Sequence, residues 1–262
     1  MLKNRLIPVL LLQSGLLVRS ELFRIHQVIG TPIYEVQRFN AWNVDELIYL
    51  DITRDDNYDL RRDDHKAKGL AAPLTILDAV SKTCFMPLTW GGRIQTVSQM
   101  REIFSRGADK ITLNTAAFRT PELVTEGAKT FGSQAIVVSM DVLRHGDGRL
   151  EVFIEGGRTA TGWDPVRWAL EVEARGAGEI LLQSIDRDGT GKGYDLDLIR
   201  AVASTTSIPV IACSGVGRYE QYAEGIRAGA SAVAAANIWH FKELSDRGGK
   251  RALAQAGIGV RI

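Results

Sequence analysis

The fold is decided by two stretches of the chain, Pro87-Leu-Thr-Trp-Gly-Gly-Arg93 and Pro209-Val-Ile-Ala-Cys-Ser-Gly-Val-Gly-Arg218. Each is a short apolar run that begins at a proline and ends in glycines, as a buried strand bounded by turns does. Each leads to a Gly-Ala pair and a further apolar run, and the two prolines lie 122 residues apart, as do Gly107 and Gly229. A Gly-Ala pair alone is a common helix-to-strand link, but an offset shared by several motifs predicts two similar halves.

Short apolar runs recur along the whole chain, at about residues 6–11, 47–52, 85–90, 110–114, 134–140, 179–184, 208–213 and 232–236. They are rich in β-branched residues or leucine, which is typical of buried parallel strands. The segments between them are amphipathic, as in Thr96–Arg106 and Pro165–Arg175, and this indicates helices. Eight strands alternating with helices predict a (β/α)8 (TIM) barrel with a half-barrel internal repeat, and an open doubly wound sheet is the alternative.

Composition sets the class of protein. A chain of 262 residues with 45% hydrophobic residues suits one globular domain spanning residues 1–262. The net charge of +1 gives no broad basic surface for nucleic acid, and no segment approaches the roughly 20 apolar residues that cross a membrane. The two cysteines, Cys84 and Cys213, make neither a disulfide framework nor a zinc site of the usual spacing. We therefore expect a cytoplasmic protein without metal or cofactor.

Glycines and small polar residues follow five of the predicted strands. In barrels of this kind the chemistry lies in the loops after the strands. Glycine lets backbone N–H groups approach an anion, and a following helix start adds a positive dipole. Because the pattern occurs in both halves, it predicts a phosphate site on each side of the mouth and an elongated ligand phosphorylated at both ends; tight turns alone are the alternative. The residues expected to bind this ligand are Gly91, Gly92, Asn114, Thr115, Asp188, Gly189, Thr190, Gly215, Gly217, Ala236 and Asn237.

Longer blocks carry a family resemblance. They are Phe131-Gly-Ser-Gln134, Arg175-Gly-Ala-Gly-Glu-Ile180 and Ser184-Ile-Asp-Arg-Asp-Gly-Thr190, with shorter matches at Gly107–Lys110, Asn114–Ala116 and His240-Phe241. Together they resemble the cyclase subunit (HisF) family of imidazole glycerol phosphate synthase, from Arg5 to about Arg261. The resemblance implies a heterodimer with a class I glutaminase. Ammonia from that partner crosses the barrel and attacks a bisphosphorylated ribulosyl aminoimidazole carboxamide ribotide, which gives imidazole glycerol phosphate and an aminoimidazole carboxamide ribotide.

The same resemblance implies catalytic residues. Family cyclases use an aspartate at the end of the first strand and another at the end of the fifth, and two such carboxylates can serve as general acid and general base. The second is present as Asp141, which we expect to be catalytic, whereas Leu11 stands at the first position. Arg19 matches a lysine of a mobile loop and is expected to bind substrate. Acidic residues that line the mouth and are candidates for the missing role are Asp51, which is also expected to bind substrate, Asp186 and Asp188. Other departures from the family pattern are Trp90, Arg93 and Cys213-Ser214.

Four charged residues begin strands at the opposite face of the barrel: Arg5, Glu46, Lys110 and Glu179. Charges in that position are costly to desolvate unless they are paired, and two cations with two anions satisfy one another. In the family these residues match a salt-bridged ring at the entrance of the ammonia passage, and Asp109 matches a residue at the glutaminase interface. The alternative is an ion-pair plug with a purely structural role, because features of this face usually serve stability.

Three further functions compete with an ordinary cyclase. A diverged paralogue, in which Leu11 ends cyclisation, would activate a glutaminase and pass ammonia to another acceptor, such as a surface-polysaccharide sugar amidotransferase. A single-subunit phosphosugar isomerase of the sister family needs acids on both strands and has no use for the charged ring. A structural scaffold would leave the phosphate loops idle.

The histidines and the main charge run receive ordinary interpretations. His26, His65 and His145 are expected in solvated loops, and His240 is expected to be structural. The charged stretch Arg54–Lys68 is expected to be a solvated loop and helix start, as charge runs usually are.

Overall fold

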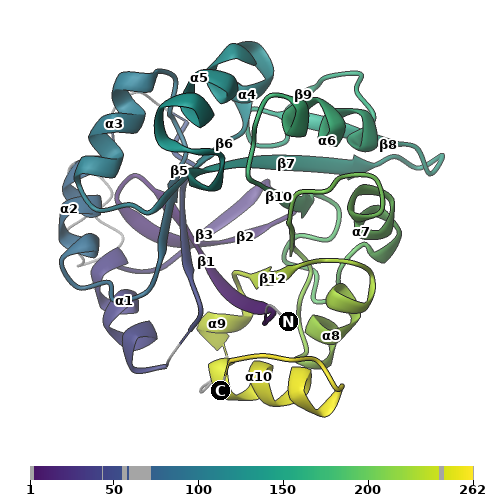
Figure 1. Cartoon of the computed structure of the whole chain (residues 1–262). Coiled ribbons are helices and arrows are strands. Elements are labelled where there is room, and N and C mark those ends of the chain that lie inside the picture. Colours follow the sequence, from purple (N-terminus) through teal and green to yellow (C-terminus); the bar gives the residue numbers. More distant parts are fainter. Residues whose placement is uncertain (1–2, 43, 55–57, 59–71, 242–244, 262) are drawn as a thin grey trace.

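Eight parallel strands close a barrel, with the helices outside it (Figure 1). The structure is a computed structural model and describes residues 3–42, 44–54, 58, 72–241 and 245–261. The barrel strands, in chain order, are β1 Arg5–Gln13, β4 Leu47–Asp51, β5 Leu88–Gly91, β6 Lys110–Leu113, β7 Ile136–Arg144, β10 Glu179–Ser184, β11 Val210–Cys213 and β12 Ala232–Ala235. Each pairs in parallel with the next, β7 pairs with β10, and β12 returns to β1. The sheet has no open edge here, so the barrel is confirmed and the open-sheet alternative is wrong.

The helices lie between the strands where the amphipathic segments predict them. They are α1 Pro32–Ala41, α2 Pro73–Ser81, α3 Val97–Ser105, α4 Thr115–Arg119, α5 Glu122–Phe131, α6 Pro165–Ala174, α7 Leu196–Ala203, α8 Glu220–Arg227, α9 Ile238–Phe241 and α10 Ser245–Gln255, with a 3-10 turn η1 at Ser133–Ala135. Thr96 caps α3 through a capping box with Gln99, and Asp164 caps α6 through the N–H groups of Val166 and Arg167. Side chains thus satisfy the free N–H groups of the first turn, which sets where these helices begin. Among the described residues, no helix has the length and hydropathy needed to span a bilayer.

Two pairs of additional antiparallel strands, here called excursions, were not predicted. Strands β2 Leu16–Glu21 and β3 Ile25–Gly30 follow β1, and strands β8 Leu150–Ile154 and β9 Thr159–Ala160 follow β7. β1 and β7 are the first and fifth barrel strands, so each half-barrel carries its added strands at the same place. The half-barrel repeat therefore extends to these excursions, although their sequences show no obvious likeness.

The barrel interior is mostly apolar, although Thr89 of β5 and Thr112 of β6 also face inward, as the register partners of Ile48 and Val137. A cluster of buried side chains inside the strands is separate from the larger core between strands and helices. Its members on the barrel strands are Ile7, Val9, Leu11, Ile48, Leu50, Val137, Leu181, Ile211, Cys213, Ala232 and Ala234. Branched aliphatic residues fill such an interior as a packed core, and β12 contributes only alanines to it. This apolar layer lies between the two faces of the barrel at which polar residues gather.

Candidate functional site

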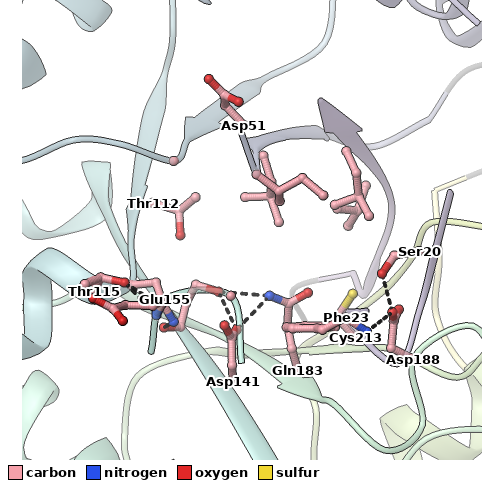
Figure 2. A pocket seen from close by; sticks show the side chains of 18 of the residues that line it. Ser20, Phe23, Asp51, Thr112, Thr115, Asp141, Glu155, Gln183, Asp188 and Cys213 are labelled. Carbon is pink, nitrogen blue, oxygen red and sulfur yellow. Dashed lines mark hydrogen bonds between the residues drawn. The ribbon is translucent and has the colours of Figure 1, made fainter. Parts of the chain in front are cut away.

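A cavity of about 690 Å³ lies at the carboxyl ends of the strands. Figure 2 shows part of its lining, with Asp141, Gln183, Cys213 and Asp188 along one side. Most of the predicted ligand-binding residues line it, and these are Asp51, Gly92, Asn114, Thr115, Asp141, Asp188, Gly189, Gly215, Ala236 and Asn237. The structure therefore brings residues of the strand ends in both halves around one cavity.

Four of the predicted residues do not line the cavity. A Cβ on Gly91 would lie 2.0 Å from Cγ2 of Thr112, and one on Gly217 would lie 2.8 Å from Cα of Gly191. These glycines therefore permit close packing of the loops. Thr190 donates its hydroxyl to the carbonyl of Arg187 at 2.7 Å, which holds its own turn together. The fourth residue is Arg19.

Arg19 lies on the outer side of its strand. Its Nε donates to Oε1 of Gln27 at 2.7 Å, and its guanidinium lies over the ring of Phe241 at 5.7 Å. Successive side chains of a strand point to opposite faces, and it is the next residue, Ser20, that lines the cavity. In this conformation of the hairpin Arg19 therefore makes no part of the cavity wall.

Asp141 lies within β7, three residues before the end of that strand, and only 4% of it is exposed. Its Oδ1 accepts hydrogen bonds from Nε2 of Gln183 at 3.0 Å and from Oγ of Ser139 at 3.5 Å. Burial raises the pKa of Asp141 to about 7, with a further increase from Asp188, while the bonds from Gln183 and Ser139 act in the opposite direction. A group with such a pKa can accept or donate a proton near neutral pH.

Leu11 lines the same cavity from β1 and is 8% exposed. Strands β1 and β7 are four places apart in the ring of eight strands, so they lie on opposite sides of the barrel. The β1 side of the cavity is apolar near this point, since Val9 and Leu50 also line it. The position that the resemblance assigns to a second acid is thus part of an aliphatic wall.

The other acidic residues near the mouth are held by loop contacts. Asp51 accepts the N–H of Thr53 at 3.0 Å on Oδ1 and the hydroxyl of Tyr58 at 2.9 Å on Oδ2. Asp188 accepts the hydroxyl of Ser20 at 2.6 Å, and burial raises its pKa. Asp186 does not line the cavity and accepts the N–H of Arg144 at 3.1 Å. Each of these carboxylates is engaged in holding a loop.

Each side of the mouth is covered by an excursion from the other half-barrel. The β2–β3 hairpin of the first half lies on residues of the second half: Asn237 Nδ2 donates to the carbonyl of Ser20 at 2.8 Å, and a Cβ on Gly189 would lie 2.4 Å from that oxygen. The β8–β9 turn of the second half lies on the first, because the N–H of Glu155 donates to Oγ1 of Thr115 at 2.9 Å. The β2–β3 hairpin and the β8–β9 turn, here called the two coverings, therefore each cover the cavity side that belongs to the other half.

Three buried polar atoms in the cavity wall have no hydrogen-bond partner among the described residues. They are Oγ1 of Thr112, Oγ of Ser214 and Oδ1 of Asn237. Thr112 belongs to the first half, and Ser214 and Asn237 belong to the second. Buried polar groups in native proteins nearly always find partners, so these atoms mark positions on both sides of the cavity where a polar ligand can bind.

The four charged residues at the opposite face form a closed ring. Arg5 Nη1 lies 2.6 Å from Glu46 Oε1 and 2.9 Å from Glu179 Oε1. Lys110 Nζ lies 3.3 Å from Glu46 Oε2 and 3.1 Å from Glu179 Oε2. Burial opposes the charge of Arg5, but the carboxylates of Glu179 and Glu46 outweigh it, so the pKa of Arg5 is raised. Each cation thus touches both anions. Asp109, at the same face, is exposed and accepts the N–H of Leu88 on Oδ2 at 2.8 Å.

The histidines depart in part from expectation. His26 lies in β3 and lines the cavity, so its placement in a solvated loop was wrong; burial, and then Arg54, lower its pKa. His145 lies in the turn between β7 and β8, and its Nε2 is 2.7 Å from Oε2 of Glu151. His240 packs near Glu35, and burial lowers its pKa to about 4. His65 and most of Arg54–Lys68 lie outside the described residues. Within the described part of the chain, no group of three His, Cys, Asp or Glu side chains is placed to hold a metal ion.

Comparison with known proteins places this geometry in a family. A family model described as "Histidine biosynthesis protein" matches residues 5–245. The protein named "Imidazole glycerol phosphate synthase subunit HisF" of Gluconacetobacter diazotrophicus is 44% identical over 264 aligned positions, which cover 100% of this chain and 97% of that protein. The chain therefore belongs to the histidine biosynthesis protein family and is a homologue of the HisF subunit of imidazole glycerol phosphate synthase.

Proposed function

We propose that the chain is the ammonia-using synthase subunit of an imidazole glycerol phosphate synthase, converting a bisphosphorylated ribulosyl aminoimidazole carboxamide ribotide into imidazole glycerol phosphate. The observation that carries the proposal is the cavity, in which Asp141, a buried carboxylate with a pKa of about 7, lies between two sets of anion-binding loops. Making and breaking C–N bonds requires a group that exchanges protons near neutral pH. The same assignment predicts a cytoplasmic location.

The two sides of the mouth support a ligand with a phosphate at each end. Gly92, Asn114 and Thr115 line the first side of the cavity, and Gly189 and Gly215 line the second, with Asn237 beside them. Gly92 has a φ of +92° and Gly215 a φ of +94°, a left-handed conformation that favours glycine. Unpartnered polar atoms lie on both sides of the same cavity. Such an arrangement favours an elongated bisphosphate over a compact monophosphate.

The floor supports delivery of ammonia from a class I glutaminase. The charged ring closes the face opposite the cavity, and the interior between them is mostly apolar. Ammonia is small and uncharged, so it crosses an apolar layer at far lower cost than an ammonium ion. We place the glutaminase on this face, with the exposed Asp109 at its edge.

A second candidate function rests on Leu11. An aliphatic side chain cannot exchange a proton, and Leu11 stands at the end of β1 beside an intact ring. A diverged paralogue that activates a glutaminase and supplies ammonia to another acceptor, such as a surface-polysaccharide sugar amidotransferase, would keep the ring and need no acid there. The two candidates share the partner and differ in whether the cavity makes imidazole glycerol phosphate.

The experiment separates the source of nitrogen from the chemistry. The chain is first given the ribulosyl bisphosphate and an ammonium salt, and imidazole glycerol phosphate is measured. It is then mixed with a class I glutaminase subunit, and glutamate release is measured with and without the bisphosphate. The variant Asp141→Asn should lower product formation by about 10²–10⁴-fold. Asp186→Asn, outside the cavity, should leave it nearly unchanged.

The outcomes separate the two candidates. Product from ammonium salts that depends on Asp141 supports the synthase. Glutaminase stimulation without product supports the paralogue. The absence of both product and glutaminase stimulation contradicts both candidates. The variant Lys110→Met tests the floor, because it removes two of the four ion pairs. It should lower the glutamine-dependent rate and leave the ammonium-dependent rate unchanged, since dissolved ammonia enters from the mouth.

A further inference from the structure

We propose that Gln183 is the positioning residue of a one-carboxylate proton-transfer centre, in which Asp141 alone acts as both general base and general acid. This inference rests on the synthase function proposed above and says how that site works with a leucine at the end of β1. The sequence alone gave no sign of Gln183, because it stands within the apolar run Ile180-Leu-Leu-Gln-Ser184 and resembles part of the core.

The geometry joins two neighbouring strands. Gln183 on β10 is the register partner of Asp141 on β7, and it is 8% exposed. Its Nε2 donates to Oδ1 of Asp141 at 3.0 Å and to Oγ of Ser139 at 3.1 Å. Ser139 in turn approaches the same Oδ1 at 3.5 Å. Figure 2 shows the hydrogen bond between Gln183 and Asp141 at one wall of the cavity.

The contacts make the two oxygens of Asp141 different. Oδ1 receives both hydrogen bonds, whereas Oδ2 has no hydrogen-bond partner among the described residues. An oxygen that accepts two donors is a poor place for a proton. The exchangeable proton is therefore directed to Oδ2, in a residue that lines the cavity. A neutral amide suits this task, because it donates to the carboxylate without adding the positive charge that would hold Asp141 permanently ionised.

Burial raises the pKa of Asp141, and Gln183 is the main neighbour that lowers it. The ionisable group that acts on Asp141 is Asp188, after β10, and it disfavours a charged carboxylate. On the other side of Asp141 the neighbour is apolar, because Phe153 of β8 is its register partner. Gln183 and then Ser139 supply the hydrogen bonds that favour ionisation.

One carboxylate is sufficient for a balanced proton cycle. When ammonia adds to a carbonyl carbon of the ligand, the C=O π pair moves to the oxygen; Oδ2 takes protons from the nitrogen one at a time and returns them to that oxygen, which leaves as water as a C=N bond forms. When this nitrogen later bonds to a second carbon to close a ring, it gives a proton to Oδ2, and the nitrogen displaced from that carbon takes the C–N bonding pair and receives the proton from Oδ2. The carboxylate is regenerated with no net gain or loss of protons. A single group serves both steps only if its pKa lies near the working pH.

The test measures the ionisation of Asp141 directly and needs no turnover. In the full-length chain with ¹³C-labelled aspartate carboxyls, the signal of Asp141 is assigned by its loss in Asp141→Asn and followed from pH 4 to 10. Gln183→Met keeps a side chain of similar length without the donor, and it should move the titration midpoint upward by roughly one pH unit. Ser139→Ala, the matched control, removes the longer contact and should move it by less than half as much. An unchanged midpoint in Gln183→Met overturns the inference.

A kinetic measurement separates this inference from the synthase function. With the ribulosyl bisphosphate and ammonium salts, the acidic limb of the kcat profile in Gln183→Met should move to higher pH by the same amount as the titration, with KM little changed. A rise in KM with an unmoved pH profile would make Gln183 a ligand contact and overturn its positioning role. A shifted titration with no product from the unmodified chain would overturn the synthase function and leave only the coupling between Gln183 and Asp141.

Discussion

The two half-barrels agree in their scaffold and differ at the ends of their first strands. β1 and β7 are both followed by antiparallel excursions, and Leu11 and Asp141 both line the cavity. One side chain is aliphatic, while the other is a buried carboxyl whose pKa burial raises to about 7. Loops that line the cavity and coverings are thus present in both halves, but the first strand bears a carboxyl group at the cavity only in the second half. The difference indicates that the residue at the cavity on the first strand of a half-barrel can change while the surrounding loops are kept.

The largest expected change in stability comes from replacing Asp141 by asparagine, which removes the carboxyl that distinguishes β7 from β1. The folded-state pKa of Asp141, about 7, lies above the ordinary aspartate value of 3.8. The folded chain therefore holds this proton more tightly than the unfolded chain, and the resulting stability is present below about pH 4 and lost as pH rises through 7. Asp141→Asn should consequently raise the free energy of unfolding at pH 8 by up to about 4 kcal/mol, and much less at pH 4. Urea unfolding at the two pH values measures this.

A stabilisation of equal size at both pH values would show that packing, and not ionisation, is responsible. Asp186→Asn serves as the control, because that carboxylate lies outside the cavity and should give little change.

A smaller effect is expected when β1 is given the residue type of β7. Leu11→Asp places a carboxyl in an aliphatic wall where no partner awaits it, and it should lower the free energy of unfolding at pH 8 by roughly 1–3 kcal/mol. The loss should shrink at pH 4, where the new group is protonated. Leu11→Asn, measured beside it, reports the cost of a neutral polar side chain. A loss in Leu11→Asp that is independent of pH would mean that the new carboxyl reaches solvent.

The smallest effect concerns the two coverings. Ser20→Ala removes the 2.6 Å hydrogen bond to Asp188 that holds the β2–β3 hairpin, and Thr159→Val removes the 2.6 Å bond to Glu155 in the other covering. Each should cost about 1 kcal/mol, seen as faster amide hydrogen exchange in that excursion alone. Equal acceleration of exchange in both excursions by one variant would contradict their independence.

The barrel and the two-sided cavity follow from periodic features of the sequence. Prolines, glycines and apolar runs repeat at a constant offset, and strand period and turn chemistry are local properties. The charged ring is also predictable, since Arg5, Lys110 and Glu179 begin strands and parallel strand starts share one face. The coverings were missed because β2 and β3 are short and mix polar with apolar residues.

The finer features of the site depend on register, which the sequence does not reveal. Arg19 and Ser20 point to opposite faces, so an error of one position moves a residue out of the cavity. Gln183 meets Asp141 only because β10 and β7 pair with that register. His26 lines the cavity because an unpredicted hairpin carries it there. Contacts between strands distant in sequence therefore define which polar residues meet.

The ring at the floor has a consequence for selectivity. Its two cations and two anions already saturate one another, so it presents no net charge to whatever approaches. A sodium, chloride or hydronium ion entering from that side would surrender its hydration and find every counter-charge taken, a loss that nothing on the apolar path beyond restores. We expect the floor to discriminate by charge more than by size, keeping the inner compartment electrically isolated from the solution beneath it.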